Sequence, residues 1–418
     1  MANLIVEGGY PLSGCCMVGG AKNAVLPILA ASLLTKRSVR LLGCPALTDV
    51  DNMVRILISL GCHVEKAGHT LDIDASGVNG FELPEDLSKE LRSSIFLLGS
   101  VIGRFGRAVA TYPGGCEIGN RPIDLHLKGL SALGVDIREE GGRIYCDGRN
   151  LHGGDIHLDY PSVGATENIM MAAVSAEGET VIKNAAREPE IVDLQQFLLA
   201  AGFSVKGAGS STVVVRGGCT PRDVCYTIMP DRIVAGTLLV AGAITGGSIT
   251  VENVHVEHLS GTLSKLTECG CKLELTEHTV SLRGPKRPKE LKLVETLPHP
   301  GFPTDMQAQI FALCSIADGA SMIVENVFEN RFKHAQELVR MGGVNLVKDR
   351  MAVIRGVPRL TGAKVTAHDL RGGAALVLAG LAAEGRTVVV GAEHVDRGYD
   401  RLERMLCGLG ARVKREET

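Results

Sequence analysis

The sequence has 418 residues but no tryptophan, and aromatic residues make up only 4% of it. Single-stranded nucleic acids stack on aromatic side chains, so the platforms for such stacking are scarce here. The chain also lacks an excess of either charge, because 44 basic residues face 47 acidic ones and the net charge is -3. A general basic face for nucleic acid is therefore excluded, and any anion site must be local.

Signatures of zinc binding and of secretion are missing as well. No CxxC pair recurs and no HExxH occurs, which makes a zinc site unexpected. The twelve cysteines form no short-chain framework, and they include adjacent Cys15 and Cys16. This usage is typical of reduced thiols in the cytoplasm. The N-terminus has neither a basic segment nor a long apolar stretch, so no signal peptide is predicted.

One uncharged stretch, residues 233–251, is long enough to raise the question of a membrane span. Its four glycines and several threonines favour a buried helix, a turn and the start of a strand instead, so no membrane insertion is expected. A chain of this length exceeds a single core and predicts two or three domains.

An internal repeat runs along the whole chain. A Leu-Gly-like step before an apolar strand recurs at intervals of about 70 residues, the mark of a repeated structural unit. Each glycine of these steps suits a helix C-cap, where a left-handed residue is needed. The glycines are Gly61, Gly134, Gly202, Gly270, Gly342 and Gly410.

Within each unit an apolar helix rich in small residues comes first, and its lack of a polar face predicts burial. These helices are predicted at residues 24–34, 95–102, 169–175, 233–244, 310–316 and 374–382. Short strands follow in most units, predicted at residues 180–184, 250–253 and 323–326. The six units divide into two domains of three, with the break between the strand at 212–215 and Pro230. The predicted fold class is α/β, with buried helices surrounded by outer sheets.

Cys116 lies in a loop, residues 112–124, that three glycines and two prolines shape. Arg121 follows five residues later and can bring positive charge close to the sulfur. A nearby cation lowers the pKa of a thiol toward neutrality, where the thiol can transfer protons or attack an electrophile. The alternative interpretation is a small buried apolar residue.

The starts of the buried helices carry charged side chains. Lys22 and Arg92 place positive charge at helix N-termini, which already carry partial positive charge. One interpretation is that a bound phosphate or carboxylate pairs with them, and the other is that each is a solvated cation. Asp231, Asp305 and Asp369 suit ordinary helix caps. If such a carboxylate faced a sugar hydroxyl, it would be a candidate general base.

Arginine recurs in the loops between strands and helices, at Arg121, Arg187, Arg331 and Arg397. Surface ion pairing is one interpretation of all four, and it is favoured for Arg187, which has Glu188 beside it. Arg121 and Arg397 are the stronger candidates for contact with an anion, because each follows a short or shaped loop.

Seven motifs occur in order along the chain, at residues 19–24, 113–116, 121–126, 162–166, 184–190, 303–309 and 396–399. Together they resemble those of the UDP-N-acetylglucosamine 1-carboxyvinyltransferases, the enolpyruvyl transferases that open bacterial peptidoglycan synthesis. The resemblance extends over residues 3–413.

The resemblance implies two inside-out α/β domains with threefold pseudosymmetry. The first would span residues 22–229 and carry the Cys116 loop, and the second would span residues 1–21 and 230–418 and carry Asp305. The active site would lie in the cleft between them, closing around the sugar nucleotide. The resemblance implies phosphoenolpyruvate and UDP-N-acetylglucosamine as substrates and no metal or organic cofactor. It predicts no particular oligomeric state.

The family's residue roles carry over by motif. Cys116 would protonate the methylene carbon of phosphoenolpyruvate, and it would be the site of a phospholactoyl adduct and of alkylation by fosfomycin. Lys22, Arg121 and Arg397 would hold the phosphate and carboxylate of phosphoenolpyruvate, and Asp305 would face the sugar 3-hydroxyl. Further substrate contacts are expected from Asn23, Arg92, Arg121, Pro122, Ile123, Asp124, Leu125, Ser162, Val163, Val327, Asp369 and Arg371.

Two positions depart from the family pattern: Tyr160 stands where some members have lysine, and Glu117 follows the cysteine where a small or hydroxyl residue is common. Three other functions compete with this one. The Cys116 loop and Lys22 argue against a shikimate enolpyruvyl transferase. A cysteine hydrolase would use Cys116 and His126, but no Asn or Asp is evident to orient the histidine. A non-catalytic sugar-nucleotide sensor is the third.

Overall fold

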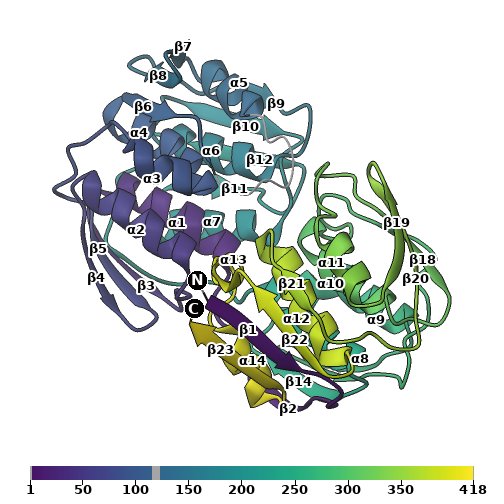
Figure 1. Ribbon diagram of the computed structural model, residues 1–418. Coiled ribbons are helices and arrows are strands. Elements are labelled where there is room, and N and C mark those ends of the chain that lie inside the picture. Colours follow the sequence, from purple (N-terminus) through teal and green to yellow (C-terminus); the bar gives the residue numbers. More distant parts are fainter. Residues whose placement is uncertain (1, 115–122, 418) are drawn as a thin grey trace. The chain divides into compact units, whose positions relative to one another are not determined.

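The computed structural model describes residues 2–114 and 123–417 (Figure 1). These residues form two compact units. The first unit comprises residues 20–114 and 123–229, and the second comprises residues 2–19 and 230–417.

The helices of the first unit are α1 (Lys22–Thr35), α2 (Thr48–Ser59), α3 (Glu85–Glu90), α4 (Phe96–Phe105), α5 (Asp124–Ala132), α6 (Val163–Ala173) and α7 (Pro189–Ala200), with the 3-10 helix η1 (Arg92–Ile95). Its strands are β3 (Ser38–Leu42), β4 (His63–Ala67), β5 (Thr70–Asp74), β6 (Arg107–Thr111), β7 (Asp136–Glu140), β8 (Arg143–Asp147), β9 (Asp155–His157), β10 (Glu179–Lys183), β11 (Ser204–Lys206), β12 (Thr212–Arg216) and β13 (Val224–Thr227).

In the described part of the first unit, these strands form three sheets with the orders β13-β3-β5-β4, β6-β8-β7 and β11-β12-β10-β9. Helices α1, α4 and α6 pack against one another and are buried along nearly their whole length (Figure 1). The strands alternate between buried and exposed residues, so each sheet buries one face and leaves the other in solvent.

The helices of the second unit are α8 (Arg232–Ile244), α9 (Ser260–Glu268), α10 (Gln307–Cys314), α11 (His334–Arg340), α12 (Leu370–Ala382), α13 (Ala392–Val395) and α14 (Leu402–Gly408), with the 3-10 helices η2 (Val256–Leu259) and η3 (Thr304–Met306). Its strands are β1 (Ala2–Glu7), β2 (Ser13–Met17), β14 (Ser248–Glu252), β15 (Lys272–Leu275), β16 (Thr279–Arg283), β17 (Val294–Glu295), β18 (Ala320–Val324), β19 (Val344–Lys348), β20 (Met351–Arg355), β21 (Lys364–Thr366), β22 (Arg386–Val390) and β23 (Arg412–Glu417).

The second unit repeats the same arrangement. Among its described residues there are three sheets, with the orders β15-β16-β14-β2, β17-β18-β20-β19 and β21-β22-β1-β23. Helices α8, α10 and α12 are the buried set (Figure 1). Strand β1 is central in its sheet, with Leu4 opposite both Val389 of β22 and Arg415 of β23. The predicted α/β class, with buried helices and outer sheets, is confirmed.

The predicted ends of several elements need correction. Helix α6 begins six residues before the prediction, because its polar residues Glu167 and Asn168 are themselves fully buried and do not follow the apolar pattern. The strands predicted to end at Asn184 and Asn253 stop one residue earlier, since both asparagines have a positive φ, 54° and 56°, that ends an extended strand.

The six recurrent glycines all lie at helix ends with positive φ, between 85° and 104°, so the predicted C-caps are confirmed. Residues 233–251 form the buried helix α8 and most of β14, as predicted. No helix within the described ranges is long and apolar enough to cross a membrane.

Candidate active site

Lys22 begins α1 and is only 9% exposed. Its ammonium nitrogen lies 2.7 Å from a carboxylate oxygen of Asp49, in the first turn of α2. The interpretation of Lys22 as a solvated cation is therefore wrong. Asn23 follows it in α1 and is half-buried. Sequence reasoning missed Asp49, which resembles an ordinary acidic residue at a helix start; the signal that points to it is a lysine that needs a partner once it is buried.

Arg92 begins η1, immediately before α4, and is also partly buried, which lowers the pKa of its guanidinium. Its Nη1 donates a hydrogen bond of 3.3 Å to the carbonyl of Pro113. Next to it, the N–H of Gly114 donates to the carbonyl of Ser88 in α3. A Cβ at Gly114 would lie 1.7 Å from the carbonyl oxygen of Lys89, so only glycine fits against α3.

This described stretch leads into the loop of the predicted catalytic cysteine. Cys116, Arg121 and Pro122 lie outside the described residues, as does Glu117.

The predicted contacts that follow the loop lie at the starts of α5 and α6. Ile123 is buried, Asp124 is exposed at the first position of α5, and Leu125 is half-buried. The Oγ of Ser162 accepts a hydrogen bond of 3.3 Å from the N–H of Ala165, so Ser162 caps α6.

His126 is buried beside these helix starts, and the side-chain amide nitrogen of Asn168 lies 3.0 Å from its Nδ1. The expectation that no Asn orients His126 is therefore wrong. The same amide nitrogen donates to the carbonyl of Ile95, and the amide oxygen accepts from the N–H of Gly99. Nδ1 of His126 is thus an acceptor, which leaves the proton on Nε2. Burial, and after it the charge of Arg92, lowers the pKa of His126 to about 3.

Asp305 lies in η3, and its carboxylate does not cap the helix. One oxygen lies 2.5 Å from Nη2 of Arg331 and the other 3.0 Å from Nη2 of Arg371. Burial alone would raise the pKa of Asp305, but the charges of Arg371 and Arg331 and their hydrogen bonds hold it well below its ordinary value. The cap interpretation is wrong for Asp305, and the carboxylate is ionised.

Both arginines of this cluster are buried, each with a side chain only 3% exposed. The interpretation of Arg331 as a surface residue is therefore wrong. The Nε and Nη1 groups of Arg331 and Arg371 have no hydrogen-bond acceptor among the residues that the structure describes. Buried donors without acceptors are costly, and an anion bound beside Asp305 would satisfy them.

Asp231 and Asp369 are caps, as the simpler interpretation predicted. Asp231 accepts from the N–H groups of Ile233 and Val234 at the start of α8. Asp369 accepts from the N–H groups of Arg371 and Gly372 at the start of α12. Asp369 thereby fixes the helix turn from which Arg371 reaches Asp305.

Val327 lies in a turn that a fully buried carboxylate organises. One oxygen of Glu325 accepts from the N–H groups of Val327 and Phe328, and the other accepts from the hydroxyl of Thr304, the residue before Asp305. Sequence reasoning missed Glu325, because a glutamate at the end of a strand carries no local signal of such a role.

A buried polar network also holds the main chain of η3. The amide nitrogen of Gln309 donates to the main-chain carbonyl of Asp305, to the hydroxyl of Thr237 and to that of Tyr399. Arg397 lies two residues before Tyr399 and is half-buried. The second unit thus brings Asp305, Arg331 and Arg371 into direct contact, with Arg397 in the turn next to Tyr399.

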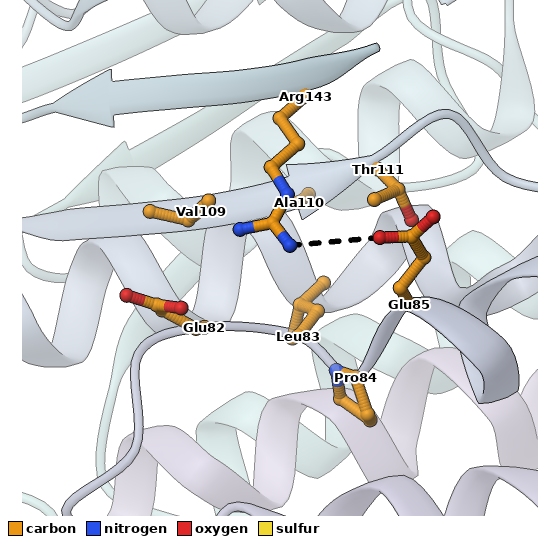
Figure 2. Close-up of a pocket in the computed structure, with 8 residues that line it drawn as sticks. All are labelled: Glu82, Leu83, Pro84, Glu85, Val109, Ala110, Thr111 and Arg143. Atoms are coloured by element: carbon orange, nitrogen blue, oxygen red, sulfur yellow. Dashed lines mark ion pairs between the residues drawn. The ribbon is translucent and has the colours of Figure 1, made fainter. Parts of the chain in front are cut away.

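The described residues contain no candidate metal site, and a cavity in the first unit is lined by residues outside the predicted site. Nowhere in residues 2–114 or 123–417 do three or more His, Cys, Asp or Glu side chains gather so that they could hold a metal ion. A cavity of about 270 Å³ lies beside β6 in the first unit, and Figure 2 shows Arg143 reaching across it toward Glu85, 3.5 Å away. None of its lining residues belongs to the predicted site.

The chain is similar to one known protein family and to several named proteins. The sequence model of the family "EPSP synthase (3-phosphoshikimate 1-carboxyvinyltransferase)" matches residues 6–406. The chain is 53% identical to UDP-N-acetylglucosamine 1-carboxyvinyltransferase 2 of Caldanaerobacter subterraneus subsp. tengcongensis, over 99% of this chain and all of that one. It is 46% identical to the UDP-N-acetylglucosamine 1-carboxyvinyltransferase of Geobacter metallireducens, over 99% of each chain.

Solved structures agree on the fold. The enolpyruvyl transferase NikO from Streptomyces tendae matches with a TM-score of 0.89 at 26% identity, over 99% of this chain and 98% of that one. EPSP synthase from Acinetobacter baumannii matches with a TM-score of 0.74 at 17% identity, over the whole of both chains. The predicted enolpyruvyl transferase fold is therefore confirmed. With a family model matched over residues 6–406 and near relatives over the full length, the chain belongs to the EPSP synthase family of enolpyruvyl transferases.

Proposed function

We propose that this chain transfers the enolpyruvyl group of phosphoenolpyruvate to the 3-hydroxyl of UDP-N-acetylglucosamine and releases inorganic phosphate, the first committed step of peptidoglycan synthesis. The observation that carries the proposal is the 53% identity, over 99% of the chain, to a protein named UDP-N-acetylglucosamine 1-carboxyvinyltransferase 2. The eleven described cysteines are all free thiols, which fits a reaction in the reducing cytoplasm.

Both substrates are anionic, and the chain offers cations to hold them. In the first unit these are Lys22 and Arg92, which would act together with Arg121. In the second unit they are Arg371, which pairs with Asp305, and Arg397. Buried, preorganised cations stabilise charge that develops in a transition state more strongly than solvated ones do. Because these few cations act locally, a chain whose net charge is -3 can still bind two anionic substrates.

The reaction needs a proton on the methylene carbon of phosphoenolpyruvate while positive charge develops at the neighbouring carbon and the sugar oxygen attacks it. We assign the proton to the Cys116 thiol, whose pKa Arg121 would lower. Loss of phosphate and of a methyl proton then restores the double bond. Contacts to the sugar nucleotide are assigned to Asn23, Arg92, Arg121, Pro122, Ile123, Asp124, Leu125, Ser162, Val163 and Val327, and further substrate contacts to Asp369 and Arg371.

Asp305 is assigned to the 3-hydroxyl. A carboxylate whose pKa lies well below the ordinary value is ionised at neutral pH and is a weak base. It would therefore accept a hydrogen bond from the hydroxyl first and take the proton only as the oxygen bonds to carbon, when the hydroxyl becomes strongly acidic. Because the depressed pKa keeps Asp305 ionised to acidic pH, the acid limb of the activity profile should arise from another group.

The rival functions are less well supported. EPSP synthases of known structure share only 17% and 18% of their residues with this chain, which supports the fold alone. A cysteine hydrolase would need a base, but His126 has a pKa of about 3 and an Nδ1 that already faces Asn168.

The proposed function is tested by phosphate release from phosphoenolpyruvate. Release should require UDP-N-acetylglucosamine and should not occur when shikimate 3-phosphate replaces it as acceptor. The product should be the enolpyruvyl ether, identified by mass spectrometry. Release with shikimate 3-phosphate alone would assign the chain to the rival transferase, and release with neither acceptor present would indicate a hydrolase.

Substitution of Cys116 tests the acid role. Cys116→Asp should keep measurable turnover, because a carboxylic acid also donates a proton, and its pH optimum should move lower. It should also lose inactivation by fosfomycin. Cys116→Ser should be far weaker, since a hydroxyl is a poor acid, while Cys15→Ser changes an exposed thiol and serves as the control. Full activity in Cys116→Ser would rule out the acid role.

The Lys22–Asp49 pair is tested by kcat/KM for phosphoenolpyruvate. Lys22→Ala should cost about 2–4 kcal/mol of transition-state stabilisation, the scale for one preorganised donor. Asp49→Asn should lower the same constant by about tenfold or more, because the ammonium loses the charge that holds it. The control is Asp51→Asn on the same helix, whose carboxylate is 54% exposed and pairs with Lys66. Unchanged kcat/KM in Lys22→Ala would contradict the assignment.

Asp305→Ala should lower kcat by about 10²–10⁴-fold, the range for losing a general base, and leave the affinity for UDP-N-acetylglucosamine largely intact. Alanine leaves two buried arginines without their carboxylate, so Asp305→Asn is measured in parallel. The control is Asp318→Ala, which removes an exposed carboxylate of the same unit. Turnover and binding are followed by steady-state kinetics and by calorimetry. A parent-like kcat in both Asp305 variants would refute the role.

A further inference from the structure

The edge strands of the outer sheets share a position that can be compared across all six repeated units. It follows the recurrent glycine at the same spacing in each unit, as Leu346 follows Gly342, and it is exposed in all of them. Leu346 of β19 is 70% exposed. In the other five units this position holds a charged residue, namely Glu65, Arg138, Lys206, Glu274 and Lys414.

A charged side chain on an edge strand has a known physical use. The outer side of an edge strand presents unpaired N–H and C=O groups, and a charge there discourages other chains from pairing with it. Five of the six edge strands keep this protection. Strand β19 has an apolar side chain at the same position, so its edge remains open to another polypeptide.

Leu346 is part of a continuous apolar surface on the sheet of β18, β20 and β19 (Figure 1). It lies opposite Val353 of β20, which lies opposite Met322 of β18. Val344 and Met351 flank this row on the same face of the sheet. These five residues, which we call the β19 face, are between 36% and 70% exposed. Side chains opposite each other on one face of a sheet are in contact, so the β19 face is contiguous.

The fold does not require an apolar surface at this place. In another sheet of the same unit, the equivalent row consists of Glu274, Ser281 and Thr250, and the hydroxyls of the last two lie 2.8 Å apart. In the sheet of β4, Glu65 lies opposite Asp72. Single exposed apolar residues are ordinary, but a contiguous group of them marks an interaction surface.

A cation borders the β19 face at each end. Arg355 of β20 lies opposite Val344, and Lys348 of β19 lies opposite Met351. Both cations are exposed, and neither forms an ion pair or a side-chain hydrogen bond with a described residue. The surface is therefore apolar at its centre and positively charged at both ends.

This charge pattern distinguishes between the possible occupants. A second copy of the chain, placed face to face by a two-fold axis, would bring cationic ends together whichever way its strands ran. A membrane surface is also disfavoured, because lipid-binding surfaces gather more cations than these two and use Trp or Tyr, which the β19 face lacks. A partner that carries negative charge beside apolar side chains fits best.

We propose that the β19 face docks a segment of another protein in which apolar side chains are flanked by carboxylates. The apolar side chains would cover Leu346 and Val353, and the carboxylates would pair with Arg355 and Lys348. The inference does not rest on the proposed function, because none of these residues belongs to the candidate site.

The test measures binding of two peptides to the full chain by fluorescence anisotropy. The probe is a short fluorescein-labelled peptide in which leucine alternates with threonine and glutamate occupies both ends, and its counterpart has lysine at both ends. The acidic peptide should bind about tenfold more tightly than the basic one. Leu346→Lys should weaken its binding by about tenfold or more, since it places a charge at the centre of the surface. Glu274→Lys is the matched control, because it introduces the same residue at the equivalent edge position, and it should bind like the parent.

The double variant Arg355→Ser with Lys348→Ser should bind both peptides alike, while phosphate release and the melting temperature stay parent-like in every variant. Equal or absent binding of the two peptides to the parent, or unchanged binding in Leu346→Lys, would overturn the inference. A loss of binding that Glu274→Lys shares would also overturn it, because charge alone would then explain the effect. A dimer in sedimentation that Leu346→Lys dissociates would assign the surface to a second copy instead. Flotation with phosphatidylglycerol vesicles that Leu346→Lys abolishes would assign it to a membrane.

Discussion

The candidate site of the second unit depends on the ion pairs of Asp305 with Arg331 and Arg371. Two guanidiniums this deeply buried are tolerated only because a carboxylate lies between them, and the carboxylate stays ionised only because they flank it. The groups around the cluster serve to hold this geometry. Glu325 fixes the turn after β18, Asp369 caps the helix of Arg371, and Gln309 binds the carbonyl of Asp305.

The first unit meets the same constraint with different residues. Lys22 is buried at the start of an apolar helix, where the helix dipole opposes a cation, and Asp49 supplies the missing negative charge from α2. In both units the inner helices are too apolar to carry their own counter-charges. The partners therefore come from neighbouring elements, and the geometry of each charged group depends on how those elements pack.

Because the partners of the buried charges come from neighbouring elements, the sequence predicts the fold better than it predicts the contacts of the site. The repeat, the buried helices and the C-cap glycines follow from local patterns, and all of them are found in the structure. Lys22 and Asp305 could also be predicted as site residues, because they lie in recognisable sequence motifs. Asp49, Glu325 and the Asn168 contact of His126 were missed, since each acts across a distance in the chain that no local pattern encodes.

The pairs also differ in what their loss would do. Removing the partner of a buried charge leaves that charge unpaired, which costs stability and function together. The contacts of Arg415 in β23 with Asp396 and Glu403 are different, because the Arg415 side chain is 14% exposed, against 3% for Arg331 and for Arg371. Loss of either carboxylate would leave a cation that water still reaches and that keeps a second partner, so it should cost less stability than loss of Asp305.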